Sequence, residues 1–225
     1  MADAKTNLTI GFIGNPNCGK TTLFNAYTGA NLKVANWPGV TVEKVEGAIR
    51  HHNMNIRLVD LPGTYSLTSY TMEEIVSRKF ILSDEVDVVI NVVDASALER
   101  SLYLTLQLLS LGLPTVVAFN MADELRAGGG RIDTGVFSKA LGVRCIAVSA
   151  LQRTGIRALT DAAVRAEREG SASALFPYTG ACAFAVRELR GAVASISEAA
   201  GVPSLFAARK LLEGDAPLET RLHLT

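Results

Sequence analysis

Cysteine is scarce in this sequence, and its three residues, Cys18, Cys145 and Cys182, are far apart. No two of them stand at the short spacing of a metal site, and an odd, scattered set does not predict a disulfide framework. The first residues also lack the charged and then apolar run of a secretory signal. We therefore expect reduced thiols in a cytosolic chain.

Charge of one sign is not in excess either, because 22 lysines and arginines balance 22 aspartates and glutamates. Domains that bind nucleic acid usually carry a basic stripe and a high pI, so we expect no nucleic acid among the partners. The hydrophobic share of 48% is typical of a soluble globular protein. The length of 225 residues fits one domain with a small addition.

No long hydrophobic run continues without interruption. Residues 101–122 hold no charged side chain and are rich in leucine and valine, but Gly112 and Pro114 divide them. A membrane-spanning helix needs about 20 consecutive apolar residues. The pattern instead predicts a helix followed by a buried strand.

Short apolar runs, typical of buried parallel strands, alternate with helical patterns along most of the chain. The expected strands include Leu8–Ile13, Ile56–Val59, Val86–Val93, Thr115–Phe119 and Arg144–Val148. The expected helices are Lys20–Thr28, Glu73–Leu82, Ser101–Leu111, Thr134–Leu141 and Ile156–Arg168. This alternation predicts an α/β fold, with a mostly parallel six-stranded sheet and helices on both faces.

One pair of strands breaks the alternation. The runs 42–49 and 54–59 are joined only by a short polar segment that contains His51, His52 and Asn53. A parallel connection needs a dozen residues or more, so these strands are expected to form an antiparallel hairpin. The two histidines are then turn residues. We expect no metal role for them, because no acidic residue or cysteine stands near them in sequence at ligand spacing.

The composition of the sequence changes after Gly170. A short link rich in serine is followed by alanine-rich segments that predict helices and no strand. We therefore expect a first domain at residues 1–170 and a small helical subdomain at residues 175–225.

The strongest motif is a phosphate-binding loop. Residues 14–21, GNPNCGKT, match the pattern G-x-x-x-x-G-K-[ST] at every fixed position, between an expected strand and an expected helix. Gly14 and Gly19 let backbone N–H groups face phosphate oxygens. Lys20 is expected to reach the β- and γ-phosphates, and the Thr21 hydroxyl to bind Mg²⁺. The other expected nucleotide contacts of this loop are Asn15, Pro16, Asn17, Cys18 and Thr22.

Three further segments narrow the nucleotide to one that carries guanine. Asp60 follows an expected strand, where its carboxylate can reach Mg²⁺ through a water, and the Gly63 amide can sense the γ-phosphate. Asp123 can accept two hydrogen bonds from guanine that adenine cannot supply. The Ala150 amide, after the last strand, can contact the guanine carbonyl oxygen. The expected guanine-binding residues are Asn120, Met121, Asp123, Ser149, Ala150 and Leu151.

Each of these segments is weak evidence when taken alone, because similar sequences are common in ordinary turns. All of them, however, follow the carboxyl ends of expected strands. That edge is where open α/β sheets bind their ligands. Their order along the chain therefore predicts a GTP- and GDP-binding domain.

The complete set of motifs resembles the translation-factor-related GTPases. Within that group, residues 36–43 (NWPGVTVE) and 60–67 (DLPGTYSL) are similar to the bacterial ferrous iron transport protein B (FeoB) family. The resemblance covers about residues 8–170. It is looser over the C-terminal helices, where the family has a GDI-like helical domain that slows GDP release.

The resemblance also implies roles for particular residues. Thr41 is expected to bind Mg²⁺ and sense the γ-phosphate. Asn17 is expected to coordinate K⁺ together with backbone carbonyls around Asn36 and Trp37, although an ordinary turn role for Asn17 stays open. Such a K⁺ would act as a fixed positive charge on the transferring phosphoryl group. The expected catalytic residues are Lys20, Thr41 and Asn17, and the sequence leaves open whether K⁺ binds.

One expected catalytic group is missing. The residue after Gly63 is Thr64, where Ras-type GTPases have the glutamine that orients the attacking water. We therefore expect slow hydrolysis. Two alternatives stay open: a nucleotide-sensing switch with negligible catalysis, and a GTPase of ribosome assembly or tRNA modification. The latter usually adds a basic RNA-binding domain, for which this chain has neither length nor charge.

The resemblance implies a cellular role as well. The chain is expected to regulate ferrous iron uptake from the cytoplasmic face of the bacterial inner membrane, with the transmembrane permease part of the same full-length protein as its partner. Its switch segments, Asn31–Thr41 and Asp60–Tyr70, are expected to move with the bound nucleotide. The oligomeric state, a homo-oligomer included, stays open.

Overall fold

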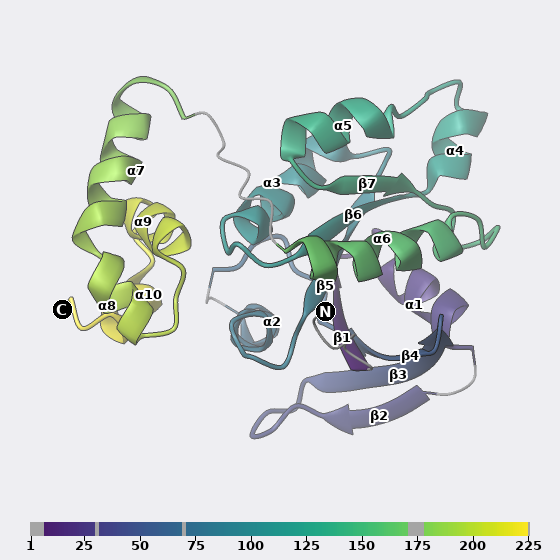
Figure 1. Cartoon of the computed structure of the whole chain (residues 1–225), viewed down its shortest axis with the longest axis horizontal. Coiled ribbons are helices and arrows are strands. Elements are labelled where there is room, and N and C mark those ends of the chain that lie inside the picture. The colour runs from purple at the N-terminus through teal and green to yellow at the C-terminus, as the bar shows by residue number, and fades with distance from the viewer. Residues whose placement is uncertain (1–6, 30–31, 69–70, 171–177, 225) are drawn as a thin grey trace.

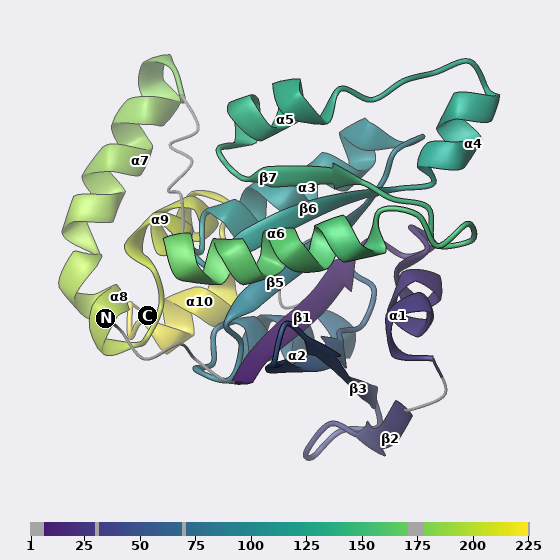
Figure 2. The ribbon, with the colours of Figure 1, turned by 45° about the vertical axis from the view of Figure 1, so that its right-hand side comes forward.

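The computed structural model describes residues 7–29, 32–68, 71–170 and 178–224. These residues form an α/β fold in which helices cover a mostly parallel sheet with the strand order β2-β3-β4-β1-β5-β6-β7 (Figures 1 and 2). The strands are β1 (Asn7–Gly14), β2 (Leu32–Asn36), β3 (Glu43–His51), β4 (Met54–Asp60), β5 (Val88–Asp94), β6 (Thr115–Asn120) and β7 (Arg144–Ala147).

The predicted hairpin is confirmed. β3 pairs antiparallel with β4, and the turn between them places His52 and Asn53 at positive φ, 46° and 64°. Two successive positive φ values are typical of the tight turns that join hairpin strands.

The predicted number of six strands is wrong, because the sheet has seven. The additional strand is β2, which pairs antiparallel with β3 at the edge of the sheet. Its five residues, LKVAN, lie mostly exposed. An exposed edge strand needs no buried side chains, so its sequence carries little of the apolar pattern by which strands are recognised.

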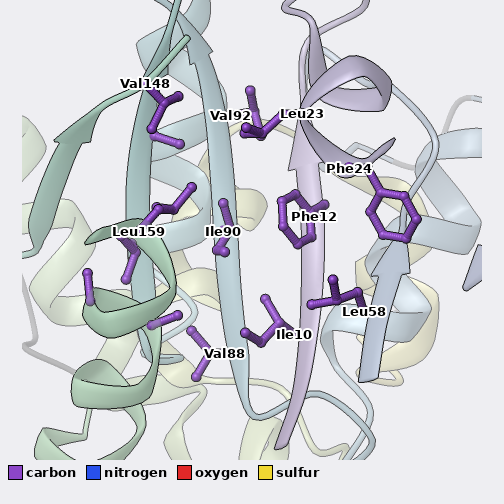
Figure 3. Packing of buried hydrophobic residues seen from close by; sticks show 14 of the residues in the cluster. Ile10, Phe12, Leu23, Phe24, Leu58, Val88, Ile90, Val92, Val148 and Leu159 are labelled. Carbon is purple, nitrogen blue, oxygen red and sulfur yellow. The ribbon is translucent and has the colours of Figure 1, made fainter. Parts of the chain in front are cut away.

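Helices cover both faces of the sheet, as predicted. Along β1, Ile10 and Phe12 point to the face covered by α1 and α6, while Ile13 points to the face covered by α2 and α3. Figure 3 shows the first of these layers, in which Phe24 of α1 and Leu159 of α6 pack over the strands. The helices around the sheet are α1 (Lys20–Thr28), α2 (Met72–Ile81), α3 (Leu98–Leu109), α4 (Ala122–Ala127), α5 (Thr134–Leu141) and α6 (Ile156–Glu169).

Residues 178–224 form helices and no strand, as the sequence predicts. The predicted boundary at residue 175 lies outside the described residues. Figure 1 shows these helices beside the sheet domain, on the side of α2 and α3. They are α7 (Gly180–Ala192), α8 (Ala194–Ala199), α9 (Ser204–Leu212) and α10 (Ala216–Arg221).

A buried ion pair joins α2 to these C-terminal helices. Arg78 of α2 donates to Asp215 over 2.9 Å, and the two side chains are only 7% and 3% exposed. Its guanidinium also lies over the Phe206 ring, 5.3 Å from the ring centre. Asp215 in turn caps α10 by accepting a hydrogen bond from the Leu218 N–H. The contact therefore orders the start of α10 and attaches it to α2.

Replacing Asp215 by asparagine leaves the buried Arg78 without its carboxylate partner. Breaking a buried pair from one side is costly, so we expect Asp215→Asn to lower the free energy of unfolding by about 3 kcal/mol in urea denaturation. The matched control is Glu188→Gln, which removes one partner of the exposed Arg187–Glu188 pair. We expect that control to cost less than about 0.5 kcal/mol. Equal effects of the two variants would contradict the interpretation.

Candidate functional site

The phosphate-binding loop lies between β1 and α1, where the parallel strands end. A Cβ atom at Gly14 would lie 2.4 Å from the Val92 carbonyl oxygen, and one at Gly19 would lie 2.4 Å from the Asn120 amide nitrogen. Gly19 also has a φ of 76°. No side chain fits at either position, so both glycines are needed for the loop to close against its neighbours.

The loop forms one wall of a pocket of about 590 Å³. Every residue that lines this pocket belongs to the set expected from the sequence. The lining residues are Asn15, Pro16, Asn17, Gly19, Lys20, Thr21, Thr22, Gly63 and Met121.

A buried ion pair lies beside this pocket. The Lys20 ammonium donates to one oxygen of Asp60, and the Thr21 hydroxyl lies 3.5 Å from the other. The side chains of Lys20 and Asp60 are each 9% exposed. Burial raises the pKa of the Asp60 carboxyl above its ordinary value, while the charge of Lys20 opposes that rise. The cation suits phosphate oxygens, and the hydroxyl and carboxylate oxygens are the hard ligands that Mg²⁺ prefers.

Asn120 connects the loops that surround the pocket. Its amide nitrogen donates to the Cys18 carbonyl over 3.0 Å, and its amide oxygen accepts from the Ala150 N–H over 3.1 Å. The side chain is 2% exposed. In the structure, the Ala150 N–H that was expected to face guanine therefore donates to Asn120. Ser149 is buried beside this contact, and Leu151 is exposed.

Asp123 lies in the first turn of α4, where it is half-buried. Met121, just before that helix, has a φ of 60°, which turns the chain sharply after β6. This turn carries Asp123 past the end of the strand while Met121 itself lines the pocket. Asn120 and Met121 thus lie beside the phosphate-binding loop, whereas Asp123 is not among the residues that line the pocket.

Cys18 is buried beneath the loop and is 1% exposed. Burial raises the pKa of its thiol to about 11, although the Lys20 backbone and charge oppose the shift. A thiol that stays protonated at neutral pH is a poor nucleophile. Cys18 therefore serves as a small packing residue.

Thr41 is not brought to the pocket. It is exposed in the turn between β2 and β3, and it is absent from the residues that line the pocket. The neighbouring Trp37 is buried instead and packs edge-on against Phe80 of α2, with 5.3 Å between ring centres. The Lys44 ammonium lies 4.6 Å from the centre of the Trp37 ring. In this arrangement the first switch segment is attached to α2.

Thr64 turns its hydroxyl away from the phosphate-binding loop. The hydroxyl donates to the Ser66 carbonyl over 2.6 Å, while the Thr64 backbone N–H donates to the Gly14 carbonyl. The carboxylate of Glu74 accepts from the hydroxyls of Ser66 and Thr68. The second switch segment is therefore held by hydrogen bonds within itself and by hydrogen bonds to Glu74 of α2.

This role of Glu74 was not predicted from the sequence. Thr71 and Glu74 form a capping box at the start of α2, in which each side chain binds the backbone N–H of the other residue. The pattern [ST]-x-x-E before an apolar run predicts such a box, so the signal was present in the sequence.

Comparison with known proteins identifies close relatives. The family profile described as ferrous iron transport protein B matches residues 8–163. The Fe(2+) transporter FeoB proteins of Salmonella typhimurium and Escherichia coli are 52% and 51% identical to this chain over 156 residues. That region is 68% of this chain but 20% of either relative, so the chain spans about a fifth of their length.

Solved structures extend the likeness to the C-terminal helices. The cytosolic domain of T. maritima FeoB in its GMPPNP form has a TM-score of 0.89 and 32% identity, covering 96% of this chain and 85% of that one. The cytosolic domain of L. pneumophila FeoB has a TM-score of 0.87 and 38% identity, with the same coverage. A GDP-bound mutant of the S. thermophilus FeoB G-domain has a TM-score of 0.86 and 38% identity, covering 95% and 81%.

None of the helices in the described part of the chain is long and apolar enough to cross a membrane. The α/β fold, the pocket beside the phosphate-binding loop and the family profile all indicate the same family. The chain therefore belongs to the ferrous iron transport protein B (FeoB) family and has the fold of its N-terminal G domain.

Proposed function

We propose that this chain binds GTP and GDP with Mg²⁺ and hydrolyses GTP slowly, and so regulates ferrous iron uptake by the membrane part of a full-length FeoB protein. The observation that carries the proposal is the convergence of Lys20, Thr21 and Asp60 beside the glycine-lined phosphate pocket. The GMPPNP and GDP forms of structurally similar FeoB domains support the choice of nucleotide.

Binding of the phosphates would change the partners of the buried ion pair. Lys20 would leave Asp60 for the β- and γ-phosphate oxygens, while backbone N–H groups of the loop bind the remaining oxygens. Thr21 and Asp60 are then free to hold Mg²⁺, directly and through a water. The ion would supply positive charge that neutralises the phosphates. Thr41 and the Gly63 amide would approach the γ-phosphate as the switch segments order.

Guanine would be selected by Asp123. Its carboxylate would accept hydrogen bonds from the ring N–H and the exocyclic amine of guanine. Asn120 would hold the segment Ser149–Leu151 next to the base, as its contact with Ala150 supports. Met121, in the pocket wall, would pack beside the nucleotide.

Slow hydrolysis would follow from the hydrogen bonding of the Thr64 hydroxyl. Its hydroxyl donates to the Ser66 carbonyl, so the attacking water would be positioned by backbone groups or by another residue. Positive charge for the transition state would then come from Lys20 and from K⁺ at Asn17. The exposure of the Asn17 side chain and its position in the pocket lining support this role.

The helix α2 would carry the nucleotide signal away from the pocket. It follows the second switch segment, contacts Trp37 of the first through Phe80, and binds the C-terminal helices through Arg78 and Asp215. Movement of either switch segment would therefore reach the GDI-like helical subdomain, proposed here as residues 175–225. Residue 31 of the first segment and residues 69–70 of the second lie outside the described part of the chain. At the cytoplasmic face of the inner membrane, the subdomain would pass the signal to the permease part.

The proposed guanine specificity predicts the behaviour of Asp123→Asn. Two hydrogen bonds to a charged acceptor are worth about 3 kcal/mol together, so GDP affinity should fall by about 100-fold in a fluorescent-GDP titration. Xanthosine diphosphate, which presents a carbonyl in place of the exocyclic amine, should bind the variant better than it binds the native chain. Glu124→Gln, one residue later on an exposed position, is the control and should leave both affinities unchanged. A variant that keeps its GDP affinity would exclude the role of Asp123.

The proposed ion-assisted hydrolysis predicts GTP turnover in different salts. With Mg²⁺ present, turnover should be several-fold faster in KCl than in NaCl at equal ionic strength, because K⁺ fits the proposed site beside Asn17. Asn17→Ala should remove the difference, and Asn25→Ala, at an exposed position on α1, should keep it. Equal and barely detectable rates in both salts, with GTP still bound, would instead favour a nucleotide-sensing switch without catalysis.

A further inference from the structure

Three potential metal ligands meet outside the pocket formed by the phosphate-binding loop. The imidazole Nε2 of His51 lies 2.7 Å from Oδ1 of Asp161, and Nε2 of His52 lies 3.5 Å from the same oxygen. All three ligand atoms lie within 4.8 Å of one another. No acidic residue stands near these histidines in the sequence, and the expectation of no metal role was based on that. The structure supplies a carboxylate from a distance, because Asp161 stands 110 residues after His51.

Backbone pairing and helix packing bring these residues together. His51 ends β3 opposite Met54, and His52 follows it in the tight turn. Asp161 lies on α6, whose apolar side chains pack on the sheet from the face it shares with α1. The Tyr27 hydroxyl of α1 donates to the Ile156 carbonyl at the start of α6 over 3.0 Å, which fixes the two helices against each other.

We propose that His51, His52 and Asp161 bind one divalent transition-metal ion of the series from Fe²⁺ to Zn²⁺. Two imidazole nitrogens and one carboxylate oxygen suit these ions, whereas Mg²⁺ and Ca²⁺ prefer oxygen ligands alone. Three protein ligands leave at least one position for water.

The distances between the ligand atoms suit a single ion. Ligands about 2.1 Å from a tetrahedral ion lie about 3.4 Å from each other. The separation of His52 Nε2 from Asp161 Oδ1, 3.5 Å, already has this value. His51 would exchange its hydrogen bond for a bond to the ion. The His52 side chain is 67% exposed, so its ring can turn without disturbing the core.

The site is separate from the nucleotide pocket. Asp60 ends β4 and the histidine turn precedes that strand, so about 20 Å of extended chain lies between them. A metal at the turn and Mg²⁺ at the nucleotide are therefore distinguishable by saturating the chain with GDP and Mg²⁺ before any other ion is added.

Cobalt(II) is a suitable probe, because its visible absorption reports coordination by protein ligands. The titration uses the whole chain with Cys182→Ser, which removes the exposed thiol, while Cys18 and Cys145 are buried. We expect one Co²⁺ per chain. Removing one ligand should weaken binding by about ten-fold or more, since even outer-shell changes cost that much.

The ligand variants are chosen to keep the fold. His52 has a positive φ, as does His223, the remaining histidine of the chain, and asparagine tolerates that conformation. His52→Asn and Asp161→Asn should each weaken Co²⁺ binding, while His223→Asn should not. Arg157 attracts the same carboxylate from one turn earlier on α6. Arg157→Gln should therefore tighten binding.

Two results would overturn the proposal. One is the absence of saturable Co²⁺ binding below millimolar concentration. The other is equal binding by the native chain and by His52→Asn. In either case the contact between His51 and Asp161 is only a hydrogen bond that attaches the hairpin turn to α6. His52→Asn decides the question even if Asp161→Asn unfolds in a thermal melt, because the His52 side chain is exposed.

Discussion

The buried pair of Lys20 and Asp60 is the interaction on which the nucleotide pocket depends. It exists because β1 and β4 are parallel neighbours, so the loop after β1 and the residue that ends β4 meet at one edge of the sheet. A buried charge without a partner is costly, and each of these residues is the counter-charge of the other. In the proposed function, phosphate would replace Asp60 as the partner of Lys20, and Mg²⁺ would replace Lys20 as the partner of Asp60. Gly14 and Gly19 shape the loop in which this proposed exchange would occur.

The proposed exchange would act on α2. Asp60 opens the second switch segment, which leads into α2, and that helix holds Trp37 on one side and Asp215 on another. The Glu74 carboxylate accepts hydrogen bonds from the hydroxyls of Ser66 and Thr68, which attaches the second switch segment to the start of α2. One helix therefore contacts both switch segments and the C-terminal helices. The proposed regulation needs no other element to connect the nucleotide with the helical subdomain.

Much of the fold and the pocket could be predicted from local sequence. The phosphate-binding loop, the parallel strands and the hairpin each have a pattern set by backbone geometry, and the pocket lining falls within the predicted set. β2 was missed because an exposed edge strand has no buried face to reveal it. Contacts such as Arg78 with Asp215, or His51 with Asp161, join residues more than a hundred positions apart. Only the packing of the elements determines such pairs. The position of Thr41 also depends on packing, since the burial of Trp37 against α2 directs the turn that carries it.

The exchange of partners is tested most directly by measuring how much Mg²⁺ increases GMPPNP affinity in the native chain and in Asp60→Asn. Without Mg²⁺, the account predicts that the variant binds GMPPNP more tightly, because no carboxylate competes for Lys20 or repels the phosphates. With Mg²⁺, the native chain should gain far more affinity than the variant. An equal gain from Mg²⁺ in both proteins would show that Asp60 has no part in holding the ion, and would contradict the account.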